Sequence, residues 1–101
     1  MPAQPFGRNE ADLPPLPMDA SIWQSIADEL ALAPQQVRIV ELILRGRQDK
    51  EIAADLGISF PTVRTYLGRI FDKTESPDRM GLVLQIFARA QELASLHSHQ
   101  E

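Results

Sequence analysis

The chain has 101 residues, contains no cysteine and carries a formal net charge of −4. This length corresponds to one domain, and the lack of cysteine excludes a disulfide framework and a thiolate metal site. No apolar run approaches the ~20 residues of a membrane span, and residues 1–5 lack the basic-then-apolar pattern of a secretion signal. We therefore expect a cytoplasmic protein.

The negative charge is unevenly distributed along the chain. Residues 1–32 carry one basic and five acidic side chains, whereas residues 33–75 carry seven basic and six acidic ones. Residues 59–73 contain three basic side chains against Asp72 alone. This stretch is compatible with a nucleic-acid-binding surface, although its few cations predict only modest non-specific affinity for phosphates.

Five of the eight prolines lie within residues 1–18. Residues 12–17 contain three of them, which prevents a helix, and no strand is available for pairing. We interpret residues 1–18 as a disordered, extended arm. The alternative is a strip that docks on this domain or on a partner through Leu13 and Leu16.

A helix is expected over residues 21–32. Apolar residues recur there at the spacing of one helix face, at Ile22, Ile26 and Leu30. Asp19 or Ser21 can cap the helix. The large side chain of Trp23 favours a role in core packing, and a ligand pocket or partner site is the alternative.

A second helix is expected over residues 34–45. Pro34 suits the first helical position because its φ is fixed and its missing N–H would have had no helical partner. Gly46 ends the segment. Ala33, at the cap position, lacks the side-chain oxygen of a good cap, which costs ~1 kcal/mol.

Residues 49–73 carry the most informative pattern of the chain. A short helix over residues 49–56 precedes Gly57, which can take a left-handed conformation at no Cβ cost. Ser59 can then cap a second helix over residues 60–73. Its inward-facing residues are Val63, Tyr66, Leu67 and Ile70. Two short helices around a glycine turn predict a helix-turn-helix, whose second helix fits the DNA major groove.

The last helix is expected to begin near Pro77, with Ser76 as its cap, and to end near Leu96 before a frayed tail at residues 97–101. Its apolar surface covers roughly 200° of the circumference, whereas an ordinary surface helix shows ~100° or somewhat more. The surplus predicts a homodimer interface, formed by Met80, Val83, Leu84, Phe87 and Ala90. The competing interpretation is that the helix containing Trp23 covers this surplus within one chain.

From Leu32 to about Phe87 the chain resembles the LuxR/GerE-type DNA-binding domain of bacterial transcription regulators. The matching pieces are Leu32 to Gln36, Ile39 to Gly46, Asp49 to Ala53, Leu56 to Ser59 and Thr62 to Arg64. The resemblance implies an all-α bundle of four helices with a helix-turn-helix, here within residues 19–96 and with one extra N-terminal helix. Thr74 stands where the family usually has Leu, so Phe71 is expected to fill that volume. Family members often carry a receiver or signal-binding domain before this unit. The residues before Leu32 are too few for either, so we expect a stand-alone form.

The outer face of the helix over residues 60–73 supplies the candidate DNA contacts. Arg has the bidentate geometry for guanine, and Thr offers a methyl or a hydroxyl to base edges. Together with the resemblance, this face implies base contacts by Arg64, Thr65, Gly68 and Arg69. Phosphate contacts are expected from Lys50, Ser59, Thr62, Arg47 and Lys73. Glu51 is interpreted instead as an intramolecular ion-pair partner.

Nothing in the sequence favours an enzyme. The two histidines, His97 and His99, lie in the tail, and no glycine-rich phosphate loop or acid–base pair is evident. We expect a nucleoid-associated, sequence-specific regulator that binds double-stranded DNA without cofactor or metal. The alternative is a helix-turn-helix module for protein contact, with a sigma factor or RNA polymerase, that lacks specific DNA binding.

Overall fold

In the computed structural model, residues 12–98 are described, and they form five helices without a strand. The helices are α1 (Ala20–Glu29), α2 (Pro34–Leu44), α3 (Asp49–Leu56), α4 (Phe60–Thr74) and α5 (Arg79–Ser98). The expected all-α fold is therefore confirmed. No helix in this part of the chain is long and apolar enough to cross a bilayer.

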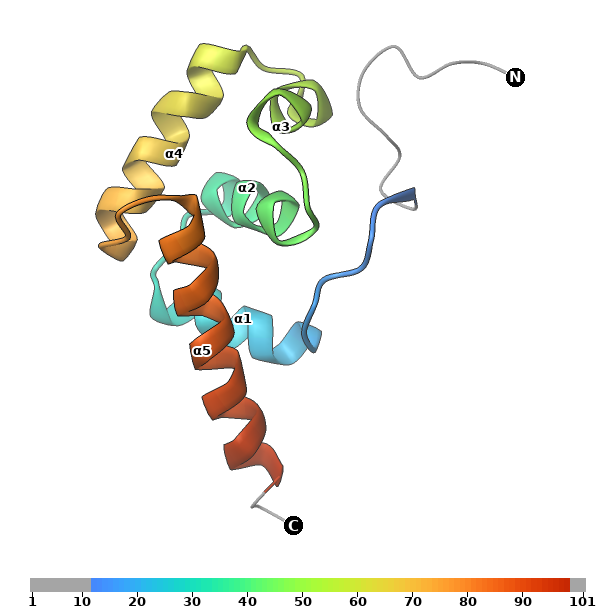
Figure 1. The fold of residues 1–101 in the computed structure, drawn as a ribbon, viewed down its shortest axis with the longest axis vertical. Coiled ribbons are helices and arrows are strands. Elements are labelled where there is room, and N and C mark those ends of the chain that lie inside the picture. Colours follow the sequence, from blue (N-terminus) through green and yellow to red (C-terminus); the bar gives the residue numbers. More distant parts are fainter. Residues whose placement is uncertain (1–11, 99–101) are drawn as a thin grey trace.

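The helices surround one core. In Figure 1, α2 lies at the centre, α3 and α4 lie above it, and α1 packs beside the long α5 below it. Every helix contributes to the largest fully buried side chains, which are Ile26, Ile39, Val40, Ile52, Val63, Ile70, Leu82 and Ile86. The periodicity of apolar residues in the sequence thus corresponds to faces that meet in this core.

Helix α1 begins where its cap predicts but ends earlier than expected. The Asp19 side chain accepts a hydrogen bond of 2.8 Å from the Ser21 N–H. The helix stops at Glu29 instead of residue 32, because Ala31 takes a left-handed conformation with φ of 57°. Trp23 is buried and its Nε1–H donates to Glu41 Oε2 at 2.7 Å, which confirms the core-packing interpretation.

Helix α2 begins at Pro34 as expected, and a nearby side chain partly replaces the missing cap. Gln36 Oε1 accepts a hydrogen bond of 2.8 Å from the Ala33 N–H. This contact satisfies one backbone donor but leaves the first turn without the oxygen that a Ser or Thr would supply. Gly46 follows the helix with φ of 88°, a conformation that glycine adopts without a Cβ penalty.

The junction of α4 and α5 corrects one expectation, the identity of the residue that caps α5. Asp78, and not Ser76, supplies a side-chain bond at the start of α5, since Asp78 Oδ1 accepts from the Gly81 N–H at 2.8 Å. The Ser76 hydroxyl instead bonds Thr74 Oγ1 at 2.8 Å and Gln85 Oε1 at 3.0 Å. Thr74 is buried and donates to the Ile70 carbonyl at 2.8 Å, so hydrogen bonds satisfy the hydroxyl at this site. Phe71 is only partly buried against the core.

The proline-rich segment packs on the domain where it is described. Leu13 is buried and Leu16 is partly buried against the core. The Arg45 Nε–H donates to the Pro14 carbonyl at 2.7 Å. In the structure, residues 12–18 thus lie against the domain, as in the alternative of a docked strip, and do not extend away from it. Residues 1–11 lie outside the described residues.

The last helix also ends at a different residue from the one expected. Helix α5 continues through Ser98, two residues beyond its expected end near Leu96. The rest of the predicted tail, including His99, lies outside the described residues.

Candidate nucleic-acid interface

The turn between α3 and α4 has the geometry that the sequence predicts. Gly57 ends α3 with φ of 69°, and the next N–H, from Ile58, donates to the Ala53 carbonyl at 3.0 Å. The Ser59 hydroxyl accepts from the Thr62 N–H at 3.2 Å and caps α4. These bonds hold α3 and α4 in a helix-turn-helix.

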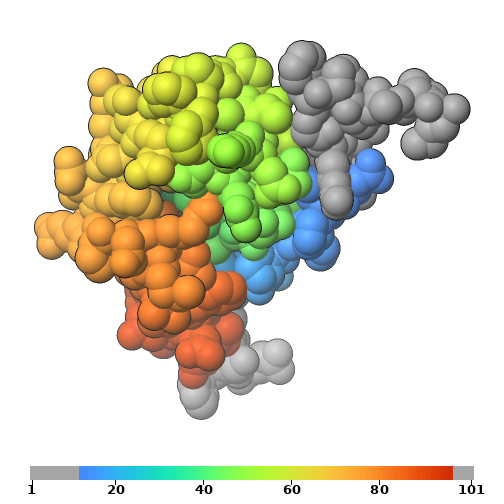
Figure 2. Space-filling view, turned by 45° about the horizontal axis from the view of Figure 1, so that its top comes forward, coloured from blue at the N-terminus to red at the C-terminus, as the bar shows by residue number. Residues whose placement is uncertain are grey.

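Helix α4 has one buried and one exposed face. The buried face consists of Val63, Leu67, Ile70 and Thr74. The four residues expected to read bases, Arg64, Thr65, Gly68 and Arg69, are all exposed. Figure 2 shows that α4, α3 and the start of α5 share one face of the molecule. The first three turns of α4 therefore present both arginines and Thr65 to solvent, beside the exposed ring of Phe60.

The two arginines of this surface each lie against an aromatic ring of the same helix. The Arg64 Cζ atom is 5.8 Å from the centre of the Phe60 ring, and the Arg69 Cζ atom is 6.0 Å from that of Tyr66. Such contacts are favourable but weak at exposed sites. The Arg64 side chain keeps 64% of its surface exposed. Both guanidinium groups therefore remain accessible to a ligand.

Three of the expected phosphate contacts lie on this same side of the helix-turn-helix. Lys50 is exposed in the first turn of α3. The hydroxyls of Ser59 and Thr62 form a hydrogen bond of 2.8 Å with each other at the start of α4. The N-terminus of α4 adds a partial positive charge at this point. Ser59 and Thr62 thus place two hydroxyls at a helix N-terminus, a position that favours anions.

Arg47 is placed differently from its expected role. Its side chain is only 8% exposed, and it forms hydrogen bonds of 2.7 and 2.9 Å to the two Asp55 oxygens. Its Nη1 also lies 3.1 Å from Glu51 Oε2, so Glu51 is an intramolecular partner as predicted. The hydrogen bonds that Arg47 donates to Asp55 raise the pKa of Arg47 further above its ordinary value. Arg47 holds the turn before α3 onto that helix and is not positioned for phosphate.

Lys73 also has an internal partner. Its ammonium group donates to the Ala31 carbonyl at 2.7 Å and to Gln36 Oε1 at 3.2 Å. These bonds connect the end of α4 to the loop between α1 and α2 and to the first turn of α2. A phosphate contact by Lys73 would have to compete with them, so we leave it out of the proposed surface.

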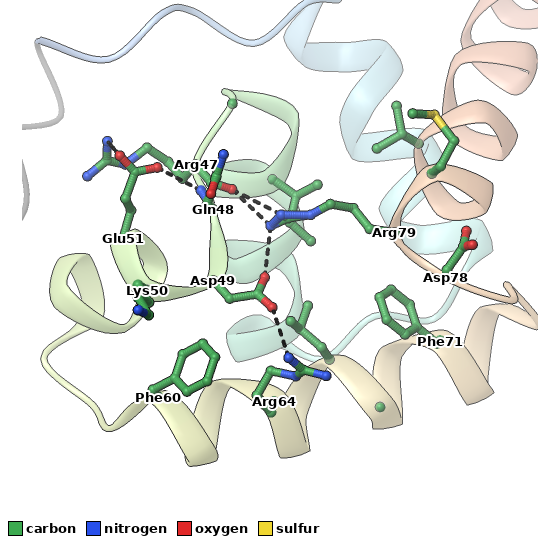
Figure 3. Close-up of a pocket in the computed structure, with 16 residues that line it drawn as sticks. Arg47, Gln48, Asp49, Lys50, Glu51, Phe60, Arg64, Phe71, Asp78 and Arg79 are labelled. Atoms are coloured by element: carbon green, nitrogen blue, oxygen red, sulfur yellow. Dashed lines mark hydrogen bonds and ion pairs between the residues drawn. The ribbon is translucent and has the colours of Figure 1, made fainter.

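The structure adds two residues that the sequence did not single out. Arg79, at the start of α5, donates to the Arg47 carbonyl at 2.9 Å and to Asp49 Oδ1 at 3.0 Å. Asp49 in turn lies next to Arg64, as Figure 3 shows. These residues line an open groove between α3, α4 and the start of α5. Asp49 and Arg79 are 30 positions apart in the chain, so no local sequence pattern indicates that they pair.

The arrangement is that of a known regulator family. Residues 30–86 match the family described as bacterial regulatory proteins, luxR family. The chain belongs to this family. In this LuxR-type DNA-binding domain the match includes α2, α3 and α4 completely, whereas α1 precedes the matched residues.

Two curated proteins are similar to about half of the chain. The chain is 34% identical over 55 residues to the probable transcriptional regulator ycf29 of Cyanophora paradoxa, covering 54% of this chain and 26% of the relative. It is 36% identical over 55 residues to the response regulator Rre1 of Synechocystis sp., covering 54% of this chain and 24% of the relative. The chain thus spans about a quarter of the length of these curated relatives. No solved structure gave a significant match.

The expected dimer surface on α5 is only partly available. Met80 and Leu84 are 63% and 60% exposed, Phe87 is 37% exposed, and Val83 is partly buried. Ala90 is buried at 8% exposure within the domain, which removes it from the expected interface. Helix α1 packs on α5, and Arg89 fastens the two with bonds of 2.8 Å to both Glu29 oxygens. The N-terminal helix therefore covers one side of α5 and leaves the other exposed.

Proposed function

We propose that this chain is a sequence-specific regulator of transcription that places α4 in the major groove of double-stranded DNA. The observation that carries the proposal is the exposed face of α4, which presents Arg64, Thr65, Gly68 and Arg69 opposite its buried face. In a helix-turn-helix, the N-terminal part of the second helix reaches base edges. The membership in the luxR family of bacterial regulatory proteins supports the same role.

The side chains on this face differ in what they can read. Arg64 and Arg69 have the fork geometry that bonds guanine O6 and N7. The Thr65 hydroxyl donates to the Pro61 carbonyl at 3.1 Å, so it can offer DNA an acceptor or its methyl group but not that proton. Gly68 has no side chain, which allows the backbone of α4 to approach a base or a phosphate closely.

Contacts to the phosphate backbone of DNA would fix the register of α4 on the duplex. We assign these to Ser59 and Thr62 at the N-terminus of α4, and to Lys50 in the first turn of α3, which lines the same groove as Phe60. With few cations on this surface, affinity for unrelated sequences should be modest and should fall only gradually with salt, because few phosphates are neutralised. Binding to chromosomal DNA would place the protein at the nucleoid of a bacterial cytoplasm.

A second copy of the chain would occupy the exposed side of α5. Met80, Val83, Leu84 and Phe87 form an apolar stripe at intervals of three and four residues, and three of them are exposed. A two-fold dimer through this stripe would match a DNA site with two half-sites. The exposed stripe also suits the alternative, a contact with a sigma factor or RNA polymerase.

The test compares the DNA binding of one arginine variant and one lysine variant with that of the unaltered protein. Duplexes recovered from a random library by the unaltered protein are the probes, and gel shift or anisotropy measures binding across salt concentrations. Arg64→Ala should lose ~1–3 kcal/mol of binding free energy and relax preference at one base pair. Lys50→Ala should weaken binding to all duplexes alike. If the unaltered protein enriches no sequence at low salt, specific DNA binding is refuted and the protein-contact function replaces it.

A further inference from the structure

Asp49, the first residue of α3, lies where three helices meet (Figure 3). Its Oδ1 accepts a hydrogen bond of 3.0 Å from Arg79 Nη2, at the start of α5. Its Oδ2 lies 3.9 Å from Arg64 Nη1, on the exposed face of α4. The carboxylate therefore has one oxygen directed to each arginine.

The position of the Asp49 carboxylate is itself fixed. Arg79 donates both to Asp49 and to the Arg47 carbonyl, and the second of these bonds measures 2.9 Å. The Asp49 side chain is only 26% exposed. A planar guanidinium that bonds two acceptors at once restrains both of them. The Asp49 carboxylate is thus held in place at the edge of the groove.

The Arg64 guanidinium lies close to both the Asp49 carboxylate and an aromatic ring. Its Cζ atom is 5.8 Å from the centre of the Phe60 ring, on the preceding turn of α4. An unrestrained exposed arginine samples many rotamers and loses that freedom when it binds. The two neighbours favour orientations of the guanidinium close to them before DNA arrives, while its side chain stays 64% exposed.

We propose that Asp49 is a positioning residue that aims Arg64 and thereby raises discrimination at the base pair which Arg64 reads. This inference rests on the proposed function, in which Arg64 contacts a base. Arg79 supplies a positive charge to the same carboxylate, so Asp49 does not neutralise Arg64 alone, and the three side chains keep a net positive charge. Asp49 therefore directs the guanidinium without cancelling its attraction to DNA.

A purely structural role for Asp49 predicts different behaviour. An acidic residue in the first turn of a helix stabilises that helix through its dipole. A variant that lost only this stabilisation would have a lower unfolding temperature and an unchanged order of preference among DNA sequences. The base preference, and not the stability, is therefore the decisive measurement.

The experiment uses the full chain, a duplex selected by the unaltered protein, and every single-base-pair variant of that duplex. Arg64→Ala first identifies the base pair that depends on Arg64. Asp49→Asn, which keeps the shape and removes the charge, should reduce discrimination at that pair by roughly threefold to tenfold, less than the loss of Arg64 itself. Discrimination at all other pairs should be unchanged. Asp49→Ser provides a second variant with a residue suited to a helix N-terminus.

Two controls isolate the interaction. Asp72→Asn removes a charge from the exposed face of α4 at a residue with no ion pair to Arg64 among residues 12–98, and it should leave the preference intact. The double variant Asp49→Asn with Arg64→Ala should discriminate no worse than Arg64→Ala alone, since both changes act through one contact.

The outcomes separate this inference from the proposed function. If Arg64→Ala alters one base pair and neither Asp49 variant does, the positioning role is refuted and the DNA-reading role stands. If Arg64→Ala alters no preference, the base-reading role of Arg64 fails first. A loss of discrimination that is equal for Asp49→Asn and Asp72→Asn would show a general charge effect and would also overturn the proposal.

Discussion

Replacing Gly68 by alanine should stabilise the protein and weaken its binding to DNA. Gly68 lies inside the exposed face of α4, and a Cβ added there meets no atom within 4 Å. Alanine in an exposed helix interior is favoured over glycine by ~1 kcal/mol, because glycine loses more backbone freedom on folding. In a domain of this size, that gain corresponds to a rise in Tm of about 4–8 °C.

The same methyl group should be unfavourable in the complex. If the α4 backbone approaches DNA closely at Gly68, the added methyl overpacks the interface, which typically costs ~1–3 kcal/mol. We therefore expect roughly tenfold weaker binding to the selected duplex. Calorimetry measures Tm, and fluorescence anisotropy measures Kd at a fixed salt concentration.

Gly81→Ala is the matched control within α5. A Cβ at Gly81 would lie 2.7 Å from Pro77 Cδ and 2.9 Å from Pro77 Cγ, so a neighbour would have to shift. We expect little or no gain in Tm and an unchanged Kd, because Gly81 is not among the residues to which DNA contacts are assigned. A stabilised Gly68→Ala protein with unaltered affinity would refute close approach to DNA. A Gly68→Ala protein that gains no stability would refute the reasoning from the exposed helix.

Three further changes test other parts of the structure. Arg47→Ala should lower the free energy of unfolding by ~3–5 kcal/mol, because it leaves Asp55 buried without its partner; a loss below ~1 kcal/mol in urea titrations would contradict the structural role. Leu84→Glu should prevent dimerisation on a two-half-site duplex without altering Tm, since the side chain is 60% exposed; ultracentrifugation that still finds dimers would exclude this surface. The hydrogen bond that Arg89 donates lowers the pKa of Glu29 below its ordinary value of 4.5. The stabilisation of the folded protein by this ion pair is therefore present above pH 4.5, and it disappears as the pH falls through the lower pKa of the folded state. Glu29→Gln should therefore show a weaker loss of stability on acidification, and an identical pH profile would argue against the pair.

The sequence alone determined the helix-turn-helix because its signals are local. Gly57 ends α3, Ser59 caps α4 and Asp19 caps α1 through bonds that join residues no more than five positions apart. Helical periodicity likewise depends on residues three or four positions apart. These features predicted which face of α4 is exposed, and thereby the accessible positions of Arg64 and Arg69.

Tertiary structure decided what the remaining side chains contact. Whether Arg47 meets a phosphate or Asp55, and whether Ala90 is exposed or buried, depends on how helices pack, which local pattern does not specify. The contact of Arg45 with Pro14 joins residues 31 positions apart, and that of Arg89 with Glu29 joins residues 60 apart. A charged side chain looks the same in sequence whether solvent, DNA or a distant carboxylate is its partner. Only the packed fold brings one of these within hydrogen-bonding distance.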